Sequence, residues 1–538
     1  MLTSTALVML MMPGLALFYG GMARRKNVLG TMMHTMVALG LVGVQWVVIG
    51  YALAFGDSAM SMTISTDEKG EAVKGSLIGF SPELMGLGVE AAASDKFKTF
   101  PATDCPLYLH AMFQGMFAII TIALVSGAFA ERVKFGAYCL FALLWTTLVY
   151  DPLAHWVWSL AWPGTDKPGG WLGGMGALDF AGGTVVHIAA GISGLAAVLL
   201  LRKRTGYGKQ TFHPNSVVLT LLGAGLLWFG WFGFNGGSAV ASNALAVSAL
   251  TVTQIAAATA SLTWMIVEWL HRGKPTALGF ASGLVAGLVA ITPAAGFVDP
   301  FGALAIGGLS GVVCYWAVVA KGKIGYDDSL DAFGIHGVGG ILGAVLTGVF
   351  CSVALWRLGT GSAADAFPGA MKDGMMAQVK VQLIATVAAA IYAFVVTAIL
   401  VLIIDKTIGF TVKEKDEAIG LDLSQHGEVG VDVGPDVDGH IATKEPKSAA
   451  NPPANGGGKK FAISVSGATE TQLIDAWSKL CQSGDTAPSK EFTAVYPYVT
   501  TVSGNTFRFR GGDPVAIKSA LQKLFADKLG GSVTATVV

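Results

Sequence analysis

Two histidines in apolar surroundings stand out as residues that could do chemistry. His187 follows Asp179 by eight residues at the start of an apolar segment that runs to about Leu201, so the imidazole lies roughly 12 Å deeper than the carboxylate at helical rise. His336 lies in a second glycine-rich segment, which begins at Asp331. Hydrocarbon does not solvate charge, so ionisable groups at membrane depth are rare and indicate a function. A neutral imidazole carries one donor and one acceptor and can relay a proton.

The composition of the chain requires a membrane. Of 538 residues, 53% are hydrophobic and 13% are charged, whereas about a quarter are charged in a typical soluble protein. The formal net charge is zero, which gives no reason to expect nucleic-acid binding. The five cysteines have neither paired nor metal-ligand spacing. Neither histidine has a nucleophile or a metal-ligand set around it in the sequence, so we predict no enzyme activity, no metal and no cofactor.

Windows of about twenty apolar residues predict eleven membrane spans. They lie near residues 2–22, 28–55, 107–130, 135–161, 180–201, 214–234, 245–270, 277–297, 300–320, 331–355 and 378–404. Loops rich in Lys and Arg, such as Arg24-Arg25-Lys26, follow the odd-numbered spans. Basic loops stay cytoplasmic, so we expect the N-terminus outside and the C-terminus inside a cell membrane. Met1 already lies in the first span and no signal peptide is evident, which suggests that the native start lies upstream or that a leader was removed.

Spans 1–5 and 6–10 resemble two halves of one design. Spans 5 and 10 are both glycine-rich and carry a histidine near the front, His187 and His336. An odd number of helices in each half forces the two halves to be inverted in the membrane. Inverted repeats with a site at the midplane are a recurring plan of transporters. The predicted fold is therefore an all-α polytopic membrane protein with an inverted 5+5 repeat.

The chain changes character after the eleventh span. Residues 1–406 form the predicted membrane domain, 407–428 a short tail, and 429–458, which are rich in Pro and Gly, a flexible linker. Residues 459–538 are typical of a soluble folded domain. Strand-like segments begin near 461, 491, 505 and 532, and helix-like segments cover 469–482 and 513–528. The order βαββαβ predicts a small ferredoxin-like sandwich.

Aromatic rings and a hydroxyl group accompany the histidines. The expected topology places several of these side chains towards the external face, above the imidazoles: Phe113, Phe117, Trp158, Asp179, Phe234 and Ser238. Phe113 and Phe117 share one face of a helix at i and i+4. Such a set suits a solute that is charged outside and neutral inside, because a π face and a hydroxyl hold a small cation while a phenyl barrier rejects hydrated ions.

Each of these residues also has a purely structural interpretation. Trp158 fits an interfacial tryptophan, and Asp179 fits a helix cap whose carboxylate accepts from the free N–H groups of the first turn. Ser238 fits a hydroxyl bonded to nearby backbone, and the phenylalanines fit ordinary packing residues. The two histidines fit a hydrogen bond between helices. Their matched positions in the two halves favour a function.

At these residues the chain resembles the ammonium transporter (Amt/Mep/Rh) family, and within it the bacterial Amt branch. The resemblance covers about residues 1–428 and rests on several stretches together: Pro13-Gly-Leu-Ala-Leu-Phe-Tyr-Gly-Gly, Arg24-Arg-Lys-Asn, Phe113-Gln-Gly-Met-Phe117, Asp179-Phe-Ala-Gly-Gly-Thr-Val-Val-His187, Trp231-Phe-Gly-Phe-Asn-Gly-Gly-Ser238, Asp331-Ala-Phe-Gly-Ile-His336-Gly and Gly420-Leu-Asp-Leu-Ser-Gln-His-Gly-Glu428.

The resemblance implies an external ammonium site formed by Phe113, Phe117, Trp158 and Ser238, with Asp179 in support. Ammonium, with methylammonium as its analogue, would be recruited there from water. The proton would leave the ion on entry, and ammonia and proton would then travel separately.

The resemblance also implies a gate of stacked Phe117 and Phe234 above a narrow apolar pore. His187 and His336 would line that pore as twin histidines, with Trp231 nearby. The assembly expected for the family is a homotrimer in the lipid bilayer with one pore in each subunit.

The segments after the last span leave open whether the protein is a transporter or a sensor. The stretch Gly420–Glu428 resembles the family's cytoplasmic tail, which couples the pores and meets PII signalling proteins. The domain at 459–538 is not part of the common family pattern, and we expect it to be regulatory, without an assigned ligand. The alternative to a transporter is an ammonium sensor that signals through this domain with little flux.

Overall fold

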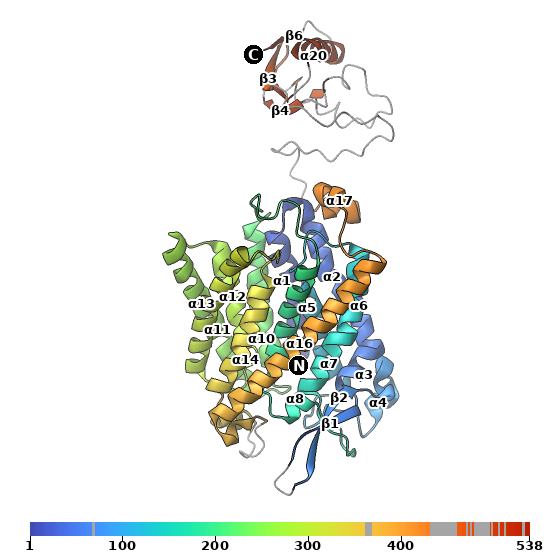
Figure 1. The fold of residues 1–538 in the computed structure, drawn as a ribbon, viewed down its shortest axis with the longest axis vertical. Coiled ribbons are helices and arrows are strands. Elements are labelled where there is room, and N and C mark those ends of the chain that lie inside the picture. Colours follow the sequence, from blue (N-terminus) through green and yellow to red (C-terminus); the bar gives the residue numbers. More distant parts are fainter. Residues whose placement is uncertain are drawn as a thin grey trace. The chain divides into compact units, whose positions relative to one another are not determined.

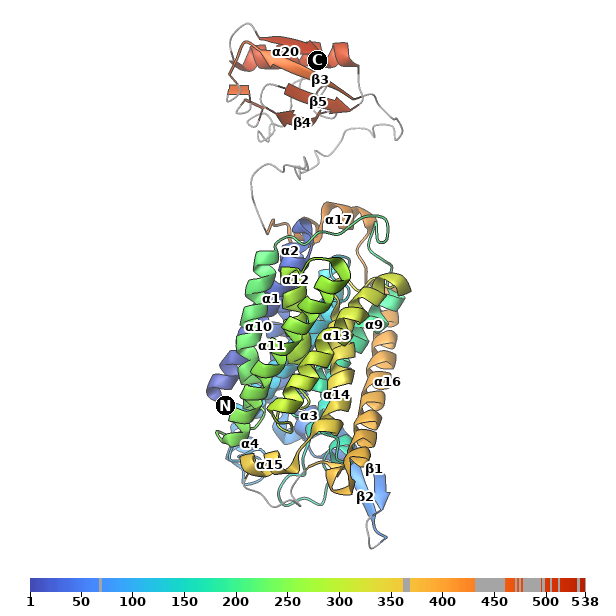
Figure 2. The ribbon, with the colours of Figure 1, turned by 90° about the vertical axis from the view of Figure 1, so that its left-hand side faces the viewer.

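The structure is a computed structural model that describes residues 1–66, 70–360 and 368–430, and, further on, 460–469, 472–473, 476–477, 495, 499–503, 506–510, 513–529 and 533–537. The chain divides into two compact units, Met1–Val431 and Asp432–Val538. The first unit is a bundle of helices with a two-stranded hairpin at one end (Figures 1 and 2). We call that end the hairpin end, and the opposite end, which carries the helix Glu414–Ile419 (α17), the tail end.

Ten helical segments among the described residues are long and apolar enough to cross a membrane. They are Leu2–Met22 (α1), Arg25–Phe55 (η1, α2, η2 and α3), Leu107–Ser126 (α5), Phe135–Trp158 (α6, η4 and α7), Gly183–Leu200 (η5 and α9), Val217–Gly237 (α10), Ala244–Arg272 (α11), Pro300–Ile324 (α13), Phe333–Phe350 (η6 and α14) and Met375–Thr407 (α16). The segment expected at 277–297 is the shorter helix Ala277–Ile291 (α12). Pro293 follows its end, where a proline cannot donate a helical hydrogen bond.

Shorter elements complete the first unit. The hairpin pairs Ser58–Thr66 (β1) with Ala72–Gly79 (β2), antiparallel. The remaining helical segments are Pro82–Leu87 (η3), Val89–Ala93 (α4), Trp171–Gly174 (α8), Val353–Thr360 (α15), Ala370–Asp373 (η8), Glu414–Ile419 (α17) and Asp422–His426 (η9). Strand β2 and helix α7 pack together, so the hairpin lies over the end of the segment that carries Trp158.

Two π-helical segments of the bundle lie where helices approach closely. Segments η5 (Gly183–Ile188) and η6 (Phe333–Gly337) carry the two candidate histidines, one in each half of the bundle. A Cβ added at Gly191, one turn past η5, would overlap the backbone of Gly337. Only glycine permits this approach, and it brings the two histidine-bearing segments into direct contact.

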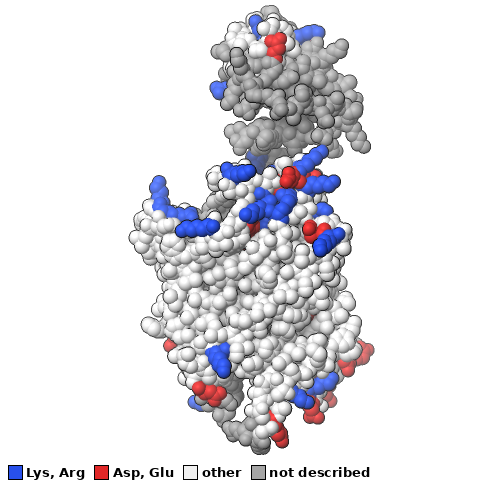
Figure 3. Space-filling model, viewed as in Figure 1, with Lys and Arg blue, Asp and Glu red and all other residues white. Residues whose placement is uncertain are grey.

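Charged side chains avoid the middle of the bundle. In Figure 3 the face in view has a broad band without charge, and most of its Lys and Arg side chains gather at the tail end. Aliphatic side chains such as Leu222, Leu262 and Ile391 are about half exposed on the outer helices. Exposed apolar side chains in an uncharged band are what contact with lipid requires.

A buried ion cluster fixes the tail end. The guanidinium of Arg204 donates to Asp327 at 2.7 Å and to Glu131 at 3.0 Å, and Arg132 donates to Asp327 at 2.9 Å. Burial alone would raise the pKa of Glu131 and of Asp327, but the neighbouring arginines hold both below their usual values. Asp327 lies in the loop before η6, and its partners come from loops 123 and 195 residues away in the sequence.

The tail after α16 folds back onto the first loop of the bundle. Glu417 on α17 forms an ion pair with Arg202 at 2.6 Å, and Asp422 on η9 accepts a hydrogen bond from the backbone N–H of Gly30 at 2.7 Å. Asn27 accepts from the N–H of Leu421. Residues 414–426 are thereby tied to two of the basic loops of the tail end, those at 24–27 and 202–204.

The second unit contains a four-stranded antiparallel sheet with the order β4-β5-β3-β6. Its strands are Lys460–Ser466 (β3), Val499–Ser503 (β4), Thr506–Arg510 (β5) and Thr534–Val537 (β6), and the helix Pro514–Leu529 (α20) packs on the sheet. Phe507, Phe509 and Phe525 are buried between them. Most of the helix expected at 469–482, and the linker expected at 429–458 apart from Val429 and Gly430, lie outside the described residues.

Candidate functional site

The two histidines meet in the interior of the bundle. Their Nδ1 atoms are 3.3 Å apart, and their rings stack with centroids 5.3 Å apart at an interplanar angle of 18°. His187 is 1% exposed and His336 3% exposed. Since a hydrogen bond between two imidazoles needs one donor and one acceptor, opposite tautomers satisfy the contact, and it fails only when both rings are protonated. The Nε2 atom of His187 is buried without a partner among the described residues.

Each histidine-bearing segment is capped by an aspartate. Both carboxylate oxygens of Asp179 accept from backbone N–H groups at the start of η5, those of Gly182, Gly183, Thr184 and Val185, at 2.6–3.1 Å. This confirms the interpretation of Asp179 as a helix cap. Burial raises the pKa of Asp179, and the four N–H groups oppose that rise.

Asp328 occupies the matching position in the other half of the bundle. It accepts from the N–H groups of Ala332 and Phe333 at the start of η6, at 3.1 and 2.8 Å, and burial raises its pKa to about 6. Asp179 precedes His187 by eight residues, and Asp328 precedes His336 by eight. Sequence reasoning missed the equivalence of these two carboxylates, although the identical spacing was the signal for it.

Aromatic rings lead from the histidines towards the hairpin end. Phe117 and Phe234 stack with centroids 4.0 Å apart at 22°, and Phe113 lies 4.9 Å from Phe117. Trp231 stacks on His187 at 5.4 Å, and its indole N–H donates to Thr292. The structure therefore brings the rings expected to form the gate into a continuous series of contacts with the histidines.

Trp158 and Ser238 lie at the outer end of this series. The indole N–H of Trp158 donates to the backbone carbonyl of Asp179 at 2.8 Å, and its ring stands edge-on to Phe117 at 6.1 Å. Ser238 donates to the carbonyl of Phe234 at 2.8 Å. Both side chains are half-buried, whereas Phe113 is fully buried. Two of the expected recruitment residues are thus partly exposed, whereas Phe113 is enclosed beside Phe117.

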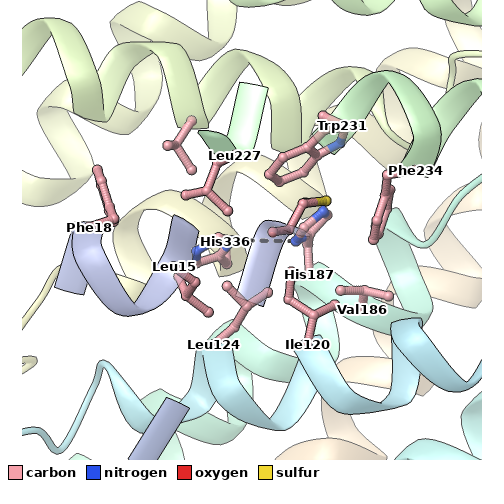
Figure 4. A pocket seen from close by; sticks show the side chains of 12 residues that line it. Leu15, Phe18, Ile120, Leu124, Val186, His187, Leu227, Trp231, Phe234 and His336 are labelled. Atoms are coloured by element: carbon pink, nitrogen blue, oxygen red, sulfur yellow. Dashed lines mark hydrogen bonds between the residues drawn. The ribbon is translucent and has the colours of Figure 1, made fainter. Parts of the chain in front are cut away.

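A narrow cavity connects the gate to the histidines. Figure 4 shows the imidazoles between Phe234 at one end and Phe18 at the other. Its other labelled lining residues are Leu15, Ile120, Leu124, Val186, Leu227 and Trp231. The space open to the centre of a water-sized molecule is about 10 Å³, which is roughly the volume that one such molecule needs. The imidazoles are the polar groups of an otherwise apolar lining, so the cavity favours a small neutral solute over a hydrated ion.

Comparison with known proteins gives consistent results over the first unit. Residues 1–431 match the Ammonium Transporter Family. An ammonium transporter of Bacillus subtilis is 44% identical over 423 residues, which are 78% of this chain and 95% of that protein. The ammonium transporter Amt1 of Archaeoglobus fulgidus is 42% identical over 428 residues, covering 80% of this chain and 97% of its own length.

Solved structures agree in fold. The crystal structure of Saccharomyces cerevisiae Mep2 has a TM-score of 0.63 and 36% identity, and covers 77% of this chain and 89% of its own. A structure described as a sensor Amt protein has a TM-score of 0.67 and 26% identity, and covers 79% of this chain and 96% of its own.

Proposed function

Since this chain belongs to the ammonium transporter family, we propose that it moves ammonium through the cavity between the stacked phenylalanines and the paired histidines. The observation that carries the proposal is the unbroken sequence of contacts from Trp158 through Phe117 and Phe234 to His187 and His336. At the mouth of this path the aromatic rings present a π face to a cation. Inside the path the imidazoles present hydrogen-bonding groups to a small neutral molecule.

The proposed mechanism begins at the hairpin end, which we assign to the outside. Ammonium binds against Trp158 and Ser238, with Phe113 and Phe117 behind them and the buried charge of Asp179 nearby. Cation–π attraction and the hydroxyl oxygen replace part of the water that the ion loses.

The proton separates from the molecule before the gate. Burial disfavours the charged form of an amine, so ammonium gives up its proton to water at the hairpin-end mouth and passes Phe117 and Phe234 as ammonia. Ammonia then reaches His187 and His336, where one ring nitrogen accepts and the other donates. A relay of the proton through the same pair requires both tautomers to invert.

The assignment of the ends also sets the wider architecture. We propose eleven spans, with α12 as the eighth, and an external N-terminus and cytoplasmic C-terminus, supported by the gathering of Lys and Arg at the tail end. The subunit is expected to act as a homotrimer. The tail at 407–428, which contacts the basic loops at 24–27 and 202–204, is the surface we propose for a PII-type protein.

For residues 459–538 we propose a ferredoxin-like regulatory domain joined by the linker 429–458 to the membrane domain 1–406. The support is the strand order β6-β3-β5-β4, which places the fourth and third strands of the domain beside the first, as the βαββαβ motif requires.

Ammonium-driven current in proteoliposomes tests the transport proposal. The parent protein on a solid-supported membrane should give a transient current upon an ammonium pulse, or take up methylammonium if transport is electroneutral. His187→Ala and His336→Ala should each reduce transport or its selectivity. Parent-like uptake and selectivity in both variants would contradict the role of the histidine pair.

A sensor remains the second candidate, because a similar structure is described as a sensor Amt protein and this chain also carries a domain beyond the membrane unit. The distinguishing result is absence of both current and uptake in the parent together with ammonium-dependent protection of residues 459–538 from protease. A variant ending at Gly430 separates the contribution of the domain, since flux that survives this truncation belongs to the membrane unit.

A further inference from the structure

A second ionisable group lies deep in the bundle, away from the pore. Asp151 is fully buried at the start of α7, directly after the π-helical segment Thr146–Tyr150 (η4). Its Oδ2 atom accepts from the side-chain amide of Gln45 at 2.8 Å. Within the described part of the chain it has no cationic partner. An uncompensated carboxylate at membrane depth costs several kcal/mol, so the charge of Asp151 must be removed or balanced.

Three oxygen atoms, on Asp151, on its partner Gln45 and on the preceding residue Tyr150, lack partners within the described part of the chain. Oδ1 of Asp151, Oε1 of Gln45 and the hydroxyl of Tyr150 are all buried without a hydrogen bond among the described residues. One proton on Oδ1 accounts for two of them, because a carboxylic acid and a primary amide can form a cyclic pair. In that pair Nε2–H donates to Oδ2, as observed, and Oδ1–H donates to Oε1.

The local backbone is built around the Gln45 amide. Nε2 donates to Thr147 at 3.1 Å as well as to Asp151, which fixes the amide's orientation. A Cβ at Gly50 would lie 2.8 Å from Oε1 and 3.0 Å from Nε2 of that amide, so glycine at this position leaves the amide its room. Gln45 and Gly50 border the π-helical segment η2 (Trp46–Gly50), and such segments occur often at functional sites.

A separate small cavity lies between the hairpin and the segment that carries Asp151. It is lined by Leu53, Leu77, Ile78, Gly79, Thr147 and Pro152, and offers about 40 Å³ to the centre of a water-sized molecule, enough for at least one water. Three of these residues belong to strand β2 of the hairpin, and Thr147 and Pro152 flank Asp151 in the sequence. Water in the cavity would lie beside the hydroxyl that accepts from Gln45.

The pair is also connected to the proposed recruitment site. Trp158 follows Asp151 by seven residues, which is two turns on the same face of α7, or about 10.5 Å. A charge that appears on Asp151 therefore acts on a cation bound at Trp158.

We propose that Asp151 and Gln45 form a proton-binding site that exchanges with the external solution and tunes ammonium recruitment at Trp158. At low external pH the acid–amide pair is intact and neutral. At higher pH the Oδ1–H bond breaks, the electron pair stays on Asp151, and the proton passes to water in the cavity beside Thr147. The new negative charge strengthens the binding of ammonium. The last step rests on the proposed transport function, whereas the proton site itself does not.

Other titratable or charged groups near this site must be distinguished from Asp151. On η4, α7 and the elements packed against them they are Tyr51, Lys74, Tyr108, His110, Tyr138, Cys139, Tyr150, His155, His187, Lys380, Tyr392, Asp405 and Lys406. His155 is engaged with the carbonyl of Ala54 and the hydroxyl of Ser76, and His110 with the hydroxyl of Tyr51. A pH effect that persists after replacement of Asp151 belongs to this group or to the bulk chemistry of ammonium.

Infrared difference spectroscopy of the full chain in proteoliposomes tests the proton site without any transport. The parent, compared between low and high external pH, should show the C=O stretch of a protonated carboxylic acid that disappears at high pH, and Asp151→Asn should lack that band. Asp299→Asn, which removes an exposed helix-capping carboxylate, is the control and should keep it. Identical spectra of parent and Asp151→Asn would overturn the protonated pair, and a band that ignores external pH would overturn the exchange.

Two further measurements cover the route and the consequence. Thr147→Val keeps Asp151 and should slow hydrogen–deuterium exchange of the same band, and an unchanged rate would overturn the cavity route. For currents, a unit charge about 10.5 Å away changes ammonium affinity by about twofold at the dielectric constant of water and about fifteenfold at an effective value of 20. The half-saturating ammonium concentration of the parent should fall by a factor in that range as pH rises, beyond any change in Asp151→Asn.

The outcomes separate the two proposals. A parent without current or uptake would contradict the transport function. The proton site would then still be tested by the infrared experiment, which does not depend on transport. A parent with current whose pH profile matches that of Asp151→Asn would contradict the tuning of recruitment.

Discussion

Replacing Asp179 with Asn should show how much stability the charged carboxylate contributes, because Asn has nearly the same size and shape but no charge. The carboxylate accepts four backbone N–H bonds, two on each oxygen. Asn retains one oxygen and turns the other into a donor that faces two N–H groups. Each buried N–H left without a partner costs about 1–3 kcal/mol, so Asp179→Asn should lose about 2–6 kcal/mol of stability.

Asn substitutions at Asp328 and Asp299 serve as comparison variants for this measurement. Asp328 accepts two N–H bonds, one on each oxygen, so Asp328→Asn should orphan one group and lose about 1–3 kcal/mol. Asp299 caps α13 with a single bond from Gly302 on one exposed oxygen, and Asn serves nearly as well at such a position, so its loss should stay within about 0.5 kcal/mol.

The assay is thermal unfolding of the detergent-solubilised proteins, monitored by intrinsic fluorescence in one buffer at one detergent concentration. The expected order of melting temperatures is Asp299→Asn, then Asp328→Asn, then Asp179→Asn as the lowest. Asp179→Glu restores the charge but displaces it by one methylene, and should fall between the parent and Asp179→Asn. If Asp179→Asn melts together with Asp299→Asn, the argument that the carboxylate holds the start of η5 is refuted.

Three other predictions follow from the packing and the charges. Phe234→Ala removes the stack at 4.0 Å and should raise leakage of hydrated cations, measured as potassium-driven current, and a parent-like selectivity would show that the ring is no barrier. Gly21→Ala would drive a methyl group into the hydroxyl and backbone of Thr220, which should lower the melting temperature, whereas Gly40→Ala, with open space around it, should not. Glu131 and Asp327 have depressed pKa values in the folded protein, so their ion pairs stabilise the fold fully above the usual carboxylate pKa range. This stabilisation is lost as the pH falls below about 4, and the melting temperature should fall with it. A melting temperature that declines already between pH 7 and pH 5 would contradict this assignment.

Much of the membrane unit could be predicted from the chain alone, since the bilayer imposes a simple rule on composition. A span must be long and apolar, so a histidine inside one conflicts with that rule. Other spans also carry a histidine, such as His110 and His155, and the matched positions of His187 and His336 in the two halves are what single out this pair. The i, i+4 spacing of Phe113 and Phe117 is likewise local, because helix geometry fixes which side chains share a face. Asp179 as a cap follows from its position at the start of an apolar run.

Other features depend on segments that are distant in sequence, and only the tertiary structure decided them. Nothing near Asp327 in the chain indicates that Arg132 and Arg204 converge on it, because the three lie on separate loops. The pairing of Asp151 with Gln45 joins two helices 106 residues apart, and each residue alone is an unremarkable polar interruption of an apolar span. Composition and periodicity report what one helix needs from its surroundings, whereas the partners of a buried charge are set by how the helices pack, and that is a property of the whole bundle.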